Sequence, residues 1–331
     1  MRETIKVAVG VTLLLASLSL WAAPPPPNEA KCKNNWVLTP TQDLAFGAFA
    51  IESGSGTVRI NSSGAITTDG AITTASTVPV STFQVTVDNT LDRTVCGTYA
   101  FDLSWSVVPA PLTGPGTAMP LNNVLVSHPT LIPTPTELPI TGLTTANLPI
   151  TLTFQGELAT TFPQAAGDYA SPAFTVDLIQ SGKATSASGI ATATALSPLG
   201  LSETAAMDFG TVAGGSTAST VVLNTSGARS VSGDGEIISS GPGFPGQFQL
   251  TGEPGQSYSL SINGPAVLTS ASGQQISASN FSHNSSGVVP LSGSETFQVG
   301  GSLNLGPSQP AGSYSTMNAG GAPYSITVNY N

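Results

Sequence analysis

The feature that most constrains this chain is a recurring pattern of short segments in which apolar and polar residues alternate. Examples are residues 57–60, 83–87, 99–103 and 258–262. Clusters of Gly, Ser, Asn and Pro separate these segments, and no window of about 12 residues, the length of a typical helix, keeps an unbroken helical period. Period-two alternation buries one face of a strand and exposes the other. The pattern therefore predicts an all-β chain built from antiparallel sheets.

Length and charge narrow the class further. A chain of 331 residues suggests two domains. Charged side chains make up only 8% of the residues and hydrophobic ones 40%, which excludes a disordered polyampholyte. Lys and Arg total 8 against 18 Asp and Glu, a net charge of −10. Because no basic face can neutralise a phosphate backbone, we expect no nucleic-acid partner.

The first 22 residues have the order of a secretory signal peptide. Arg2 and Lys6 precede an apolar run over residues 7–20, and the small residue Ala22 ends the segment. The run is shorter than the roughly 20 residues that span a bilayer, so we expect no integral membrane segment in the mature chain. A proline-rich leader, residues 23–31, follows. We expect an exported bacterial protein that passes through the periplasm to the cell surface or the medium.

Cys32 and Cys96 are the two cysteines of the chain. An oxidising compartment would join them, and closing a loop of about 65 residues would stabilise the fold by roughly 4 kcal/mol in the chain-entropy model. A metal-binding or catalytic thiol is the alternative, but no His lies near either Cys in the sequence. We therefore predict a structural disulfide.

An internal repeat divides the chain. The tetrapeptide at residues 44–47 recurs in related form at 207–210, and in both copies a Ser-Gly pair follows at the same spacing, ending at Gly64 and Gly227. Near the end of each copy two glycines stand eleven residues apart, Gly156 with Gly167 and Gly301 with Gly312. The repeat predicts two tandem sandwiches, over residues 32–181 and 189–331, joined by a linker at 182–188.

The first copy contains a proline-rich segment, residues 109–149, in which Glu137 is the one fully charged side chain. Proline is disfavoured in central strands, so we expect long loops here. Two interpretations are open: the loops pack on their own domain, or they present apolar tips to a surface or partner. The residues of such tips would be Leu112, Met119, Leu121, Leu125 and Leu131.

Catalytic motifs are absent from the sequence. There is no G-x-S-x-G elbow, phosphate loop, H-E-x-x-H or dinucleotide fingerprint. His128 and His283 lie in different copies and form no local metal pair. Two carboxylate pairs lie in turn segments, where Asp is favoured for backbone hydrogen bonding: Asp88 with Asp92, and Asp234 with Glu236. We expect no enzyme activity, no metal and no cofactor.

The C-terminal residues alternate most regularly. Tyr324, Ile326, Val328 and Tyr330 would project from one face of a final strand. The strand either completes its own sandwich, or it borders a groove that a strand of another chain completes. An uncovered groove would require a chaperone, because open sheet edges promote aggregation.

The first copy resembles spore coat protein U-type domains, which occur in the pilins and tip subunits of archaic chaperone–usher pili. The motifs that carry this resemblance are Cys32, 44–47 (LAFG), 55–58 (SGTV), 96–99 (CGTY) and 166–169 (AGDY).

The second copy is similar to a bacterial family catalogued as domain of unknown function 4402. Its motifs are 207–210 (MDFG), 250–255 (LTGEPG), 297–301 (FQVGG) and the ending 326–331 (ITVNYN).

Together the resemblances imply two tandem immunoglobulin-like antiparallel β-sandwiches. They also imply that Cys32 and Cys96 form the family-type disulfide, and that Tyr330 lies on the strand that a periplasmic chaperone would hold. A polymerising pilin of this type would carry an apolar alternating extension, whereas residues 23–31 contain four prolines. Proline cannot donate to a strand ladder, so we expect a subunit that accepts a strand and does not supply one.

The leading hypothesis is a secreted adhesive or tip-like subunit of a fimbria-type assembly. Its partners would be a chaperone, an usher, pilin subunits and an abiotic or host surface. The alternative is a stand-alone extracellular or envelope matrix protein with complete sandwiches. A glycan-binding role is a further possibility, with Trp36, Trp105 and Tyr99 as stacking platforms, although aromatic residues on strands more often belong to the core.

Overall fold

A computed structural model describes most of the chain. Its described residues are 36–75, 77–87, 101–127, 140–143, 148–180, 183–238 and 242–331. Within these ranges every regular element is a β-strand, which confirms the expected all-β class, and no helix long and apolar enough for a membrane span occurs among them. Several sequence predictions fall outside the described residues: the signal peptide at 1–22, the leader at 23–31, the Cys32–Cys96 disulfide, Leu131, Tyr99 and His128.

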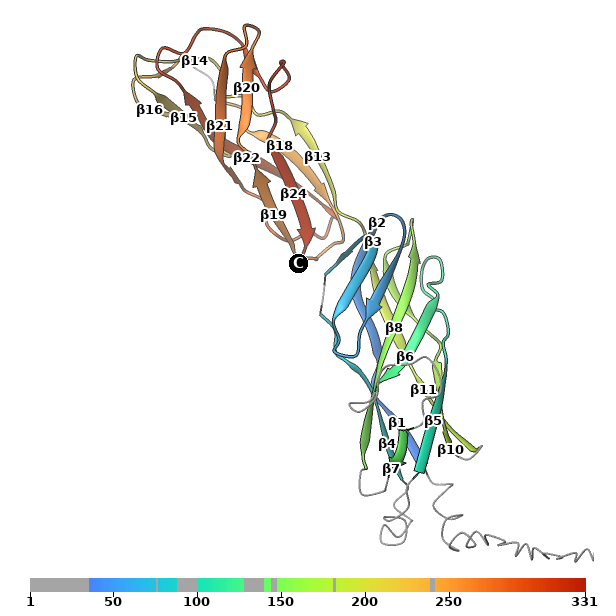
Figure 1. Cartoon of the computed structure of the whole chain (residues 1–331). Coiled ribbons are helices and arrows are strands. Elements are labelled where there is room, and N and C mark those ends of the chain that lie inside the picture. Colours follow the sequence, from blue (N-terminus) through green and yellow to red (C-terminus); the bar gives the residue numbers. More distant parts are fainter. Residues whose placement is uncertain are drawn as a thin grey trace, which may run out of the picture.

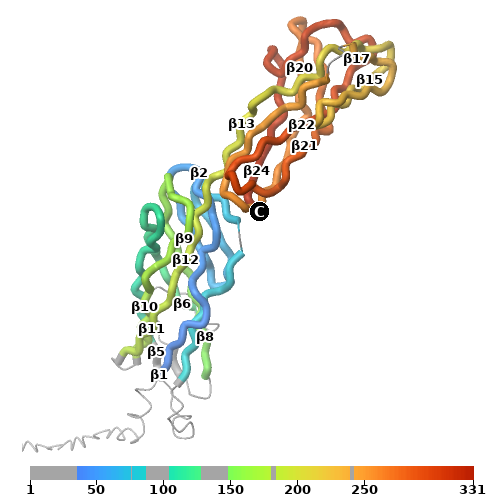
Figure 2. Tube along the Cα trace, turned by 180° about the vertical axis from the view of Figure 1, so that it is seen from behind, coloured from blue at the N-terminus to red at the C-terminus, as the bar shows by residue number. Residues whose placement is uncertain are grey.

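Two elongated domains lie end to end, and the C-terminus lies at the joint between them (Figures 1 and 2). The first domain comprises β1 (Trp36–Gln42), β2 (Leu44–Ile60), β3 (Ile66–Thr74), β4 (Ser81–Val87), β5 (Phe101–Val108), β6 (Leu121–Ser127), β7 (Ile140–Leu143), β8 (Ile150–Thr161), β9 (Gly167–Ala170), β10 (Phe174–Gln180), β11 (Lys183–Gly189) and β12 (Ala191–Leu196).

The first domain is a sandwich of two sheets. One has the order β1-β4-β8-β2-β12-β9, with β3 beside β2 and β6 beside β8, and the other has the order β11-β10-β5-β7. The ring centroids of Phe83 and Phe154 in the larger sheet lie 4.6 Å apart, and each lies 5.9 Å from that of Phe174 in the smaller sheet. These rings are fully buried and form the centre of a core that joins the two sheets.

Strand β11 occupies the region predicted as a linker, and β12 occupies the predicted start of the second domain. β11 pairs antiparallel with β10, and β12 lies between β2, to which it is parallel, and β9. The predicted linker at 182–188 and second-domain start at 189 are therefore wrong. The Ser, Ala and Thr composition suggested a flexible joint, but every residue of β11 pairs with β10, and in β12 the alternate alanines Ala191 and Ala193 are buried at the core. The first domain extends to Leu196.

The second domain follows a short connection at residues 197–199. It comprises β13 (Gly200–Ala205), β14 (Val212–Ala213), β15 (Ser219–Leu223), β16 (Arg229–Ser232), β17 (Glu236–Ile237), β18 (Gly246–Thr251), β19 (Tyr258–Asn263), β20 (Ala266–Ser270), β21 (Gln275–His283), β22 (Ser294–Leu305), β23 (Tyr314–Ser315) and β24 (Ser325–Tyr330). One sheet has the order β13-β18-β22-β21-β20-β23, with β15 beside β22 and β16 beside β15. The pair β19–β24 packs on it through a second core, and β14 pairs with β17.

The internal repeat is visible at atomic level. Oδ1 of Asn61 accepts hydrogen bonds from the backbone N–H groups two and four residues on, and from the hydroxyl of the serine two residues on, at 2.7 to 3.0 Å. Asn224 repeats all three bonds at 2.8 to 3.0 Å. Gly64 and Gly227 then adopt φ angles of 81° and 85°, which favour glycine. The two domains thus share a turn at equivalent positions.

A hydrogen-bond clamp joins the domains. Ser197 donates from its backbone N–H (3.0 Å) and its hydroxyl (2.8 Å) to Oε2 of Glu253. The hydroxyl of Tyr330 donates to the carbonyl of Ser197 (2.7 Å) and accepts from the backbone N–H of Glu253 (2.7 Å). Ala50 of β2 and Leu196 are buried in the same cluster as Tyr330. The last strand of the chain is therefore fastened to the connection between the domains.

Candidate functional site

The terminal strand β24 has one paired edge and one open edge. It pairs antiparallel with β19, from Tyr330 opposite Tyr258 to Ser325 opposite Asn263. No other described strand pairs with it. Its inward side chains belong to the core, as the alternation predicts: Tyr330 is buried, and Ile326 and Val328 are half-buried. The open edge leaves backbone donors and acceptors without a sheet neighbour.

Strand β10 is the counterpart of β24 in the first domain. The hydroxyl of Tyr169 donates to the carbonyl of Ala165 (2.8 Å), and the hydroxyl of Tyr314 donates to the carbonyl of Pro310 (2.7 Å), so the same local bond precedes both strands. β10 pairs with β5 on one side and with β11 on the other. β24 has a neighbour equivalent to β5, namely β19, and none of the described residues takes the place of β11.

A cleft of about 450 Å³ opens beside β24 where β11 lies in the first domain. Leu201 and Glu203 of β13, which is an edge strand among the described ones, line it from one sheet, and Tyr324 and Ile326 line it at the start of β24. The lining is mainly apolar and includes Leu201, Met207, Phe248, Phe281, Tyr324 and Ile326.

A second cleft, of about 810 Å³, continues from the first and shares Met207, Phe209, Leu268 and Tyr314 with it. It lies between residues 207–214 and 309–314. In the first domain the equivalent segments are the start of β2 and strand β9, and β12 lies between them, paired with both. We call the two clefts together the groove. Tyr324 and Ile326 of its lining correspond to Phe174 and Val176, which lie opposite Gly189 and Ala187, so the groove matches the end of β11 and the course of β12.

Two polar groups lie in the groove. The Tyr324 hydroxyl is buried and has no hydrogen-bond partner among the described residues. Burial, and to a lesser degree the nearby Glu203 carboxylate, raises the pKa of Tyr324 to about 12. Glu203 projects from the same face of β13 as Leu201, because alternate residues of a strand share a face.

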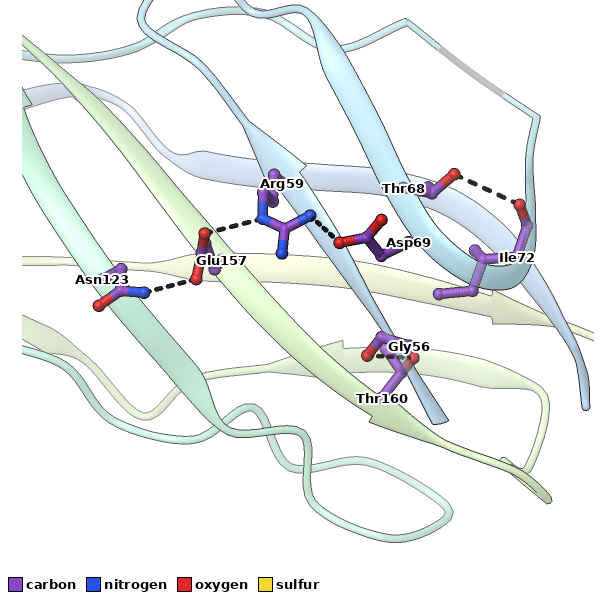
Figure 3. Close-up of polar contacts among 8 residues, drawn as sticks. All are labelled: Gly56, Arg59, Thr68, Asp69, Ile72, Asn123, Glu157 and Thr160. Carbon is purple, nitrogen blue, oxygen red and sulfur yellow. Dashed lines mark hydrogen bonds and ion pairs between the residues drawn. The ribbon is translucent and has the colours of Figure 1, made fainter. Parts of the chain in front are cut away.

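A cluster of charged side chains in the first domain lies away from the groove. Arg59 donates from Nε to Glu157 Oε1 (2.8 Å) and from Nη1 to Asp69 Oδ2 (2.7 Å), and Asn123 donates to the other Glu157 oxygen (Figure 3). The Arg59 hydrogen bond holds the pKa of Glu157 below its usual value. These side chains hydrogen-bond to one another across β2, β3, β6 and β8. The cluster therefore has a structural role, which is to link neighbouring strands.

The apolar residues predicted as contact tips are mostly core residues. Leu112, Met119 and Leu121 are at most 4% exposed, and Leu125 is half-buried. Backbone bonds of 2.9 Å run both ways between Leu112 and Met119, so the segment forms a hairpin. The prediction of exposed tips is therefore wrong for Leu112, Met119 and Leu121. Proline excluded a central strand here but did not prevent the large side chains from packing inward.

The predicted sugar-stacking aromatics Trp36 and Trp105 are also buried, at 6% and 0% exposure, so neither offers a free ring face. Of the carboxylates considered for chemistry, Asp234 accepts hydrogen bonds from Thr217 and Ser216, which hold its pKa far below the usual range. Within the described part of the chain, no three His, Cys, Asp or Glu side chains gather as a metal site.

Comparison with known proteins adds a family. The family model described as domain of unknown function (DUF4402) matches residues 37–180 and again residues 199–330. The resemblance expected for the second copy is thus confirmed. The first copy matches the same model, and its resemblance to spore coat protein U-type domains stays a prediction. No curated protein sequence matches the chain.

Among solved structures, one similar chain comes from the pre-assembly complex of the chaperone CsuC with the tip adhesion subunit CsuE of archaic chaperone–usher Csu pili of Acinetobacter baumannii. The two chains are 11% identical, with a TM-score of 0.25, over 88% of this chain and 99% of the other. At this TM-score the similarity is too low for the groove to be compared with any feature of that complex.

Proposed function

We propose, from the premise that the chain belongs to the DUF4402 family and carries its domain twice, that the second copy accepts a β-strand from another polypeptide. The protein would act as an exported, non-catalytic structural subunit, tip-like within a fimbria-type assembly at the cell surface. The observation that supports this most directly is the difference between the copies. β11 and β12 fill a path in the first domain that is an open groove in the second.

An added strand would pair with the open strand edge of the groove and would cover its apolar lining. The incoming backbone would pair with the open edge of β24, and its alternate side chains would cover the apolar lining. Each 100 Å² of apolar surface removed from water contributes about 2.5 kcal/mol. The same exposed lining is an aggregation hazard before assembly, so a periplasmic chaperone is the expected first occupant, and an usher and a pilin subunit are the later partners.

The direction of the accepted strand follows from the first domain. β11 begins with Lys183 opposite Gln180 at the end of β10 and runs back to Gly189 opposite Phe174. A strand in the groove would accordingly enter beside Tyr330, run antiparallel to β24 and continue alongside residues 207–213. The leader at 23–31, with its four prolines, is a poor source of such a strand, so a second copy of this chain is not the expected donor.

The test is to supply the missing strand in cis. A copy of residues 182–196 is appended after Asn331, so that two residues separate β24 from the copied β11, as two separate β10 from β11 in the first domain. We expect the backbone amides of β24 to exchange with deuterium more slowly and the second domain to unfold at a higher temperature. The matched control carries the same extension with alternate residues replaced by proline, which cannot pair.

Unchanged exchange at β24 in the extended chain would contradict strand acceptance. The alternative role, a stand-alone envelope or matrix protein, predicts a different result. In that case the unextended chain, purified without a chaperone, is already as resistant to proteolysis as the extended one.

A further inference from the structure

The two copies differ in chemistry at one point of the path. In the first domain, Pro40 of edge strand β1 lies opposite Phe83 of β4. In the second, Glu203 of edge strand β13 lies opposite Phe248 of β18. The registers are equivalent, because Phe83 lies opposite Leu152 and Phe248 opposite Phe297, and these two residues stand four positions before the repeated glycines Gly156 and Gly301.

The residue across the path differs as well. Phe174, the first residue of β10, is fully buried and faces Gly189 of β11. Its counterpart Tyr324, which directly precedes β24, adds a hydroxyl that has no partner among the described residues. Glu203 likewise makes no hydrogen bond or ion pair with any described residue. An apolar wall in the first domain thus becomes, in the second, an apolar wall with a carboxylate and a phenol oxygen.

Glu203 is exposed and the Tyr324 hydroxyl is buried, so a strand that covers both groups has to supply a hydrogen-bond donor. A carboxylate accepts hydrogen bonds only, and a buried hydroxyl without a partner costs free energy. A cationic side chain meets both needs, since an ammonium or guanidinium group donates several hydrogen bonds and carries the opposite charge. The net charge of −10 favours approach of a cationic segment in general.

The register identifies the position of that cation. A Cβ built on Gly189 would lie 2.5 Å from a ring carbon of Phe174 and 2.6 Å from one of Phe83. A side chain at this position of the strand therefore points inward, at the rings equivalent to Tyr324 and Phe248. In the first domain there is no room for one, whereas the second domain has the cleft lined by Glu203, Phe248 and Tyr324.

We propose that the strand accepted by the second domain carries a Lys or Arg at the position opposite Tyr324, where it pairs with Glu203 and donates to the Tyr324 hydroxyl. This inference rests on the proposed function and adds the chemistry of the partner: an extended segment with small or apolar inward residues and one inward cation. It also explains how the groove would discriminate against a strand such as β11, which has glycine at that position.

The probes are synthetic peptides with the sequence of residues 183–196, carrying Gly, Met, Lys or Glu at the position of Gly189. Binding to the full chain is measured by titration calorimetry. We expect the Lys peptide to bind at least about tenfold more tightly than the Met peptide, which has a similar stem without the charge, and the Glu peptide to bind most weakly.

Protein variants then locate the effect. Glu203→Gln is expected to abolish the preference for Lys over Met, and Tyr324→Phe to reduce it. Glu52→Gln removes one exposed carboxylate of the first domain and is expected to leave the preference intact.

The outcomes separate the two proposals. Equal binding of the Lys and Met peptides would overturn the cation assignment while strand acceptance stands. A Lys preference that survives Glu203→Gln would assign it to the general acidity of the chain and would also overturn the inference. Failure of every peptide to bind, together with unchanged β24 exchange in the extended chain, would overturn the proposed function itself.

Discussion

Strand β10 of the first domain and β24 of the second hold equivalent places, but β10 has a neighbour on both edges and β24 on one. The walls beside them are alike in kind. Leu44 and Phe46 of β2 are fully covered by their own domain. Of their counterparts, Met207 lines the groove half-buried, and Phe209, which also borders the groove, is 7% exposed.

The difference shows that the described strands of the second domain leave uncovered an apolar surface whose equivalent is covered in the first. A wall permanently exposed to water has no physical reason to be lined by Met, Phe, Leu and Ile, as the first cleft of the groove is. Exposed apolar areas of this kind mark interaction sites. The first domain shows what fits there, because its β12 meets the equivalent wall with small side chains, Ala191, Ala193 and Ala195.

The largest expected effect is unfolding of the first domain, in which β11 and β12 fill the path equivalent to the groove. Ala193→Asp places a carboxyl group at a position 4% exposed, between β2 and β9. Holding that carboxyl neutral at pH 7 costs about 4 kcal/mol, since the ordinary pKa of Asp is about 3.9. We expect hydrogen exchange to show the first domain unfolded and the second one intact. Thr192→Asn, at the neighbouring outward position, is the control; loss of both domains together would show that they are not independent.

The second-largest effect is expected at the joint between the two domains. Tyr330→Phe removes the hydroxyl that links Ser197 to Glu253 and leaves both partners unsatisfied, at a cost of about 1–3 kcal/mol. We expect a lower unfolding temperature for the second domain and, by small-angle scattering, a wider range of inter-domain angles. Tyr314→Phe loses the bond to Pro310 within the second domain and should leave the scattering unchanged. Equal scattering of the Tyr330 variant and the native chain would argue against a clamp.

A matched pair of turns sharpens the comparison. Asn61→Ala and Asn224→Ala each remove three local hydrogen bonds of the same geometry. Each is expected to cost about 1 kcal/mol, and each in its own domain only, as measured by domain-resolved hydrogen exchange in denaturant. A cost at Asn224 that spreads to the first domain would show coupling through the joint.

The smallest effect concerns alkaline pH. Because the pKa of Tyr324 is raised to about 12, the folded chain keeps the phenol proton when the unfolded chain begins to lose it near pH 10. The stability due to this group is fully present below pH 10 and is lost as the pH rises to about 12. Thermal unfolding of native and Tyr324→Phe chains over this range should show a shallower decline for the variant. Parallel declines would remove Tyr324 from the alkaline transition.

The sequence predicts the strands and the duplication well, because both are local signals. Alternation at Tyr324, Ile326, Val328 and Tyr330 identifies a strand face, and the Ser-Gly turns identify equivalent positions. It does not reveal β11 and β12, since Ala, Ser and Thr are as typical of linkers as of strands packed against crowded walls.

The groove itself depends on pairing between distant segments. β12 is parallel to β2, about 150 residues earlier, and no local pattern specifies such a contact. The same holds for Leu112 and Met119, whose burial depends on the core that receives them. Pro40 and Glu203 are equivalent only through the register of their strands, which the sequence alone does not specify.

The clamp at Tyr330 has a mechanical consequence. A strand held along β24 and pulled lengthwise would load its row of backbone bonds in shear, the direction in which many bonds resist together. The end of β24 passes this load through Ser197 to β12, which is hydrogen-bonded into a sheet on both sides. Tension applied at the groove would thus reach the first domain through a continuous series of hydrogen-bonded contacts. The covalent connection at residues 197–199 would not carry the load alone.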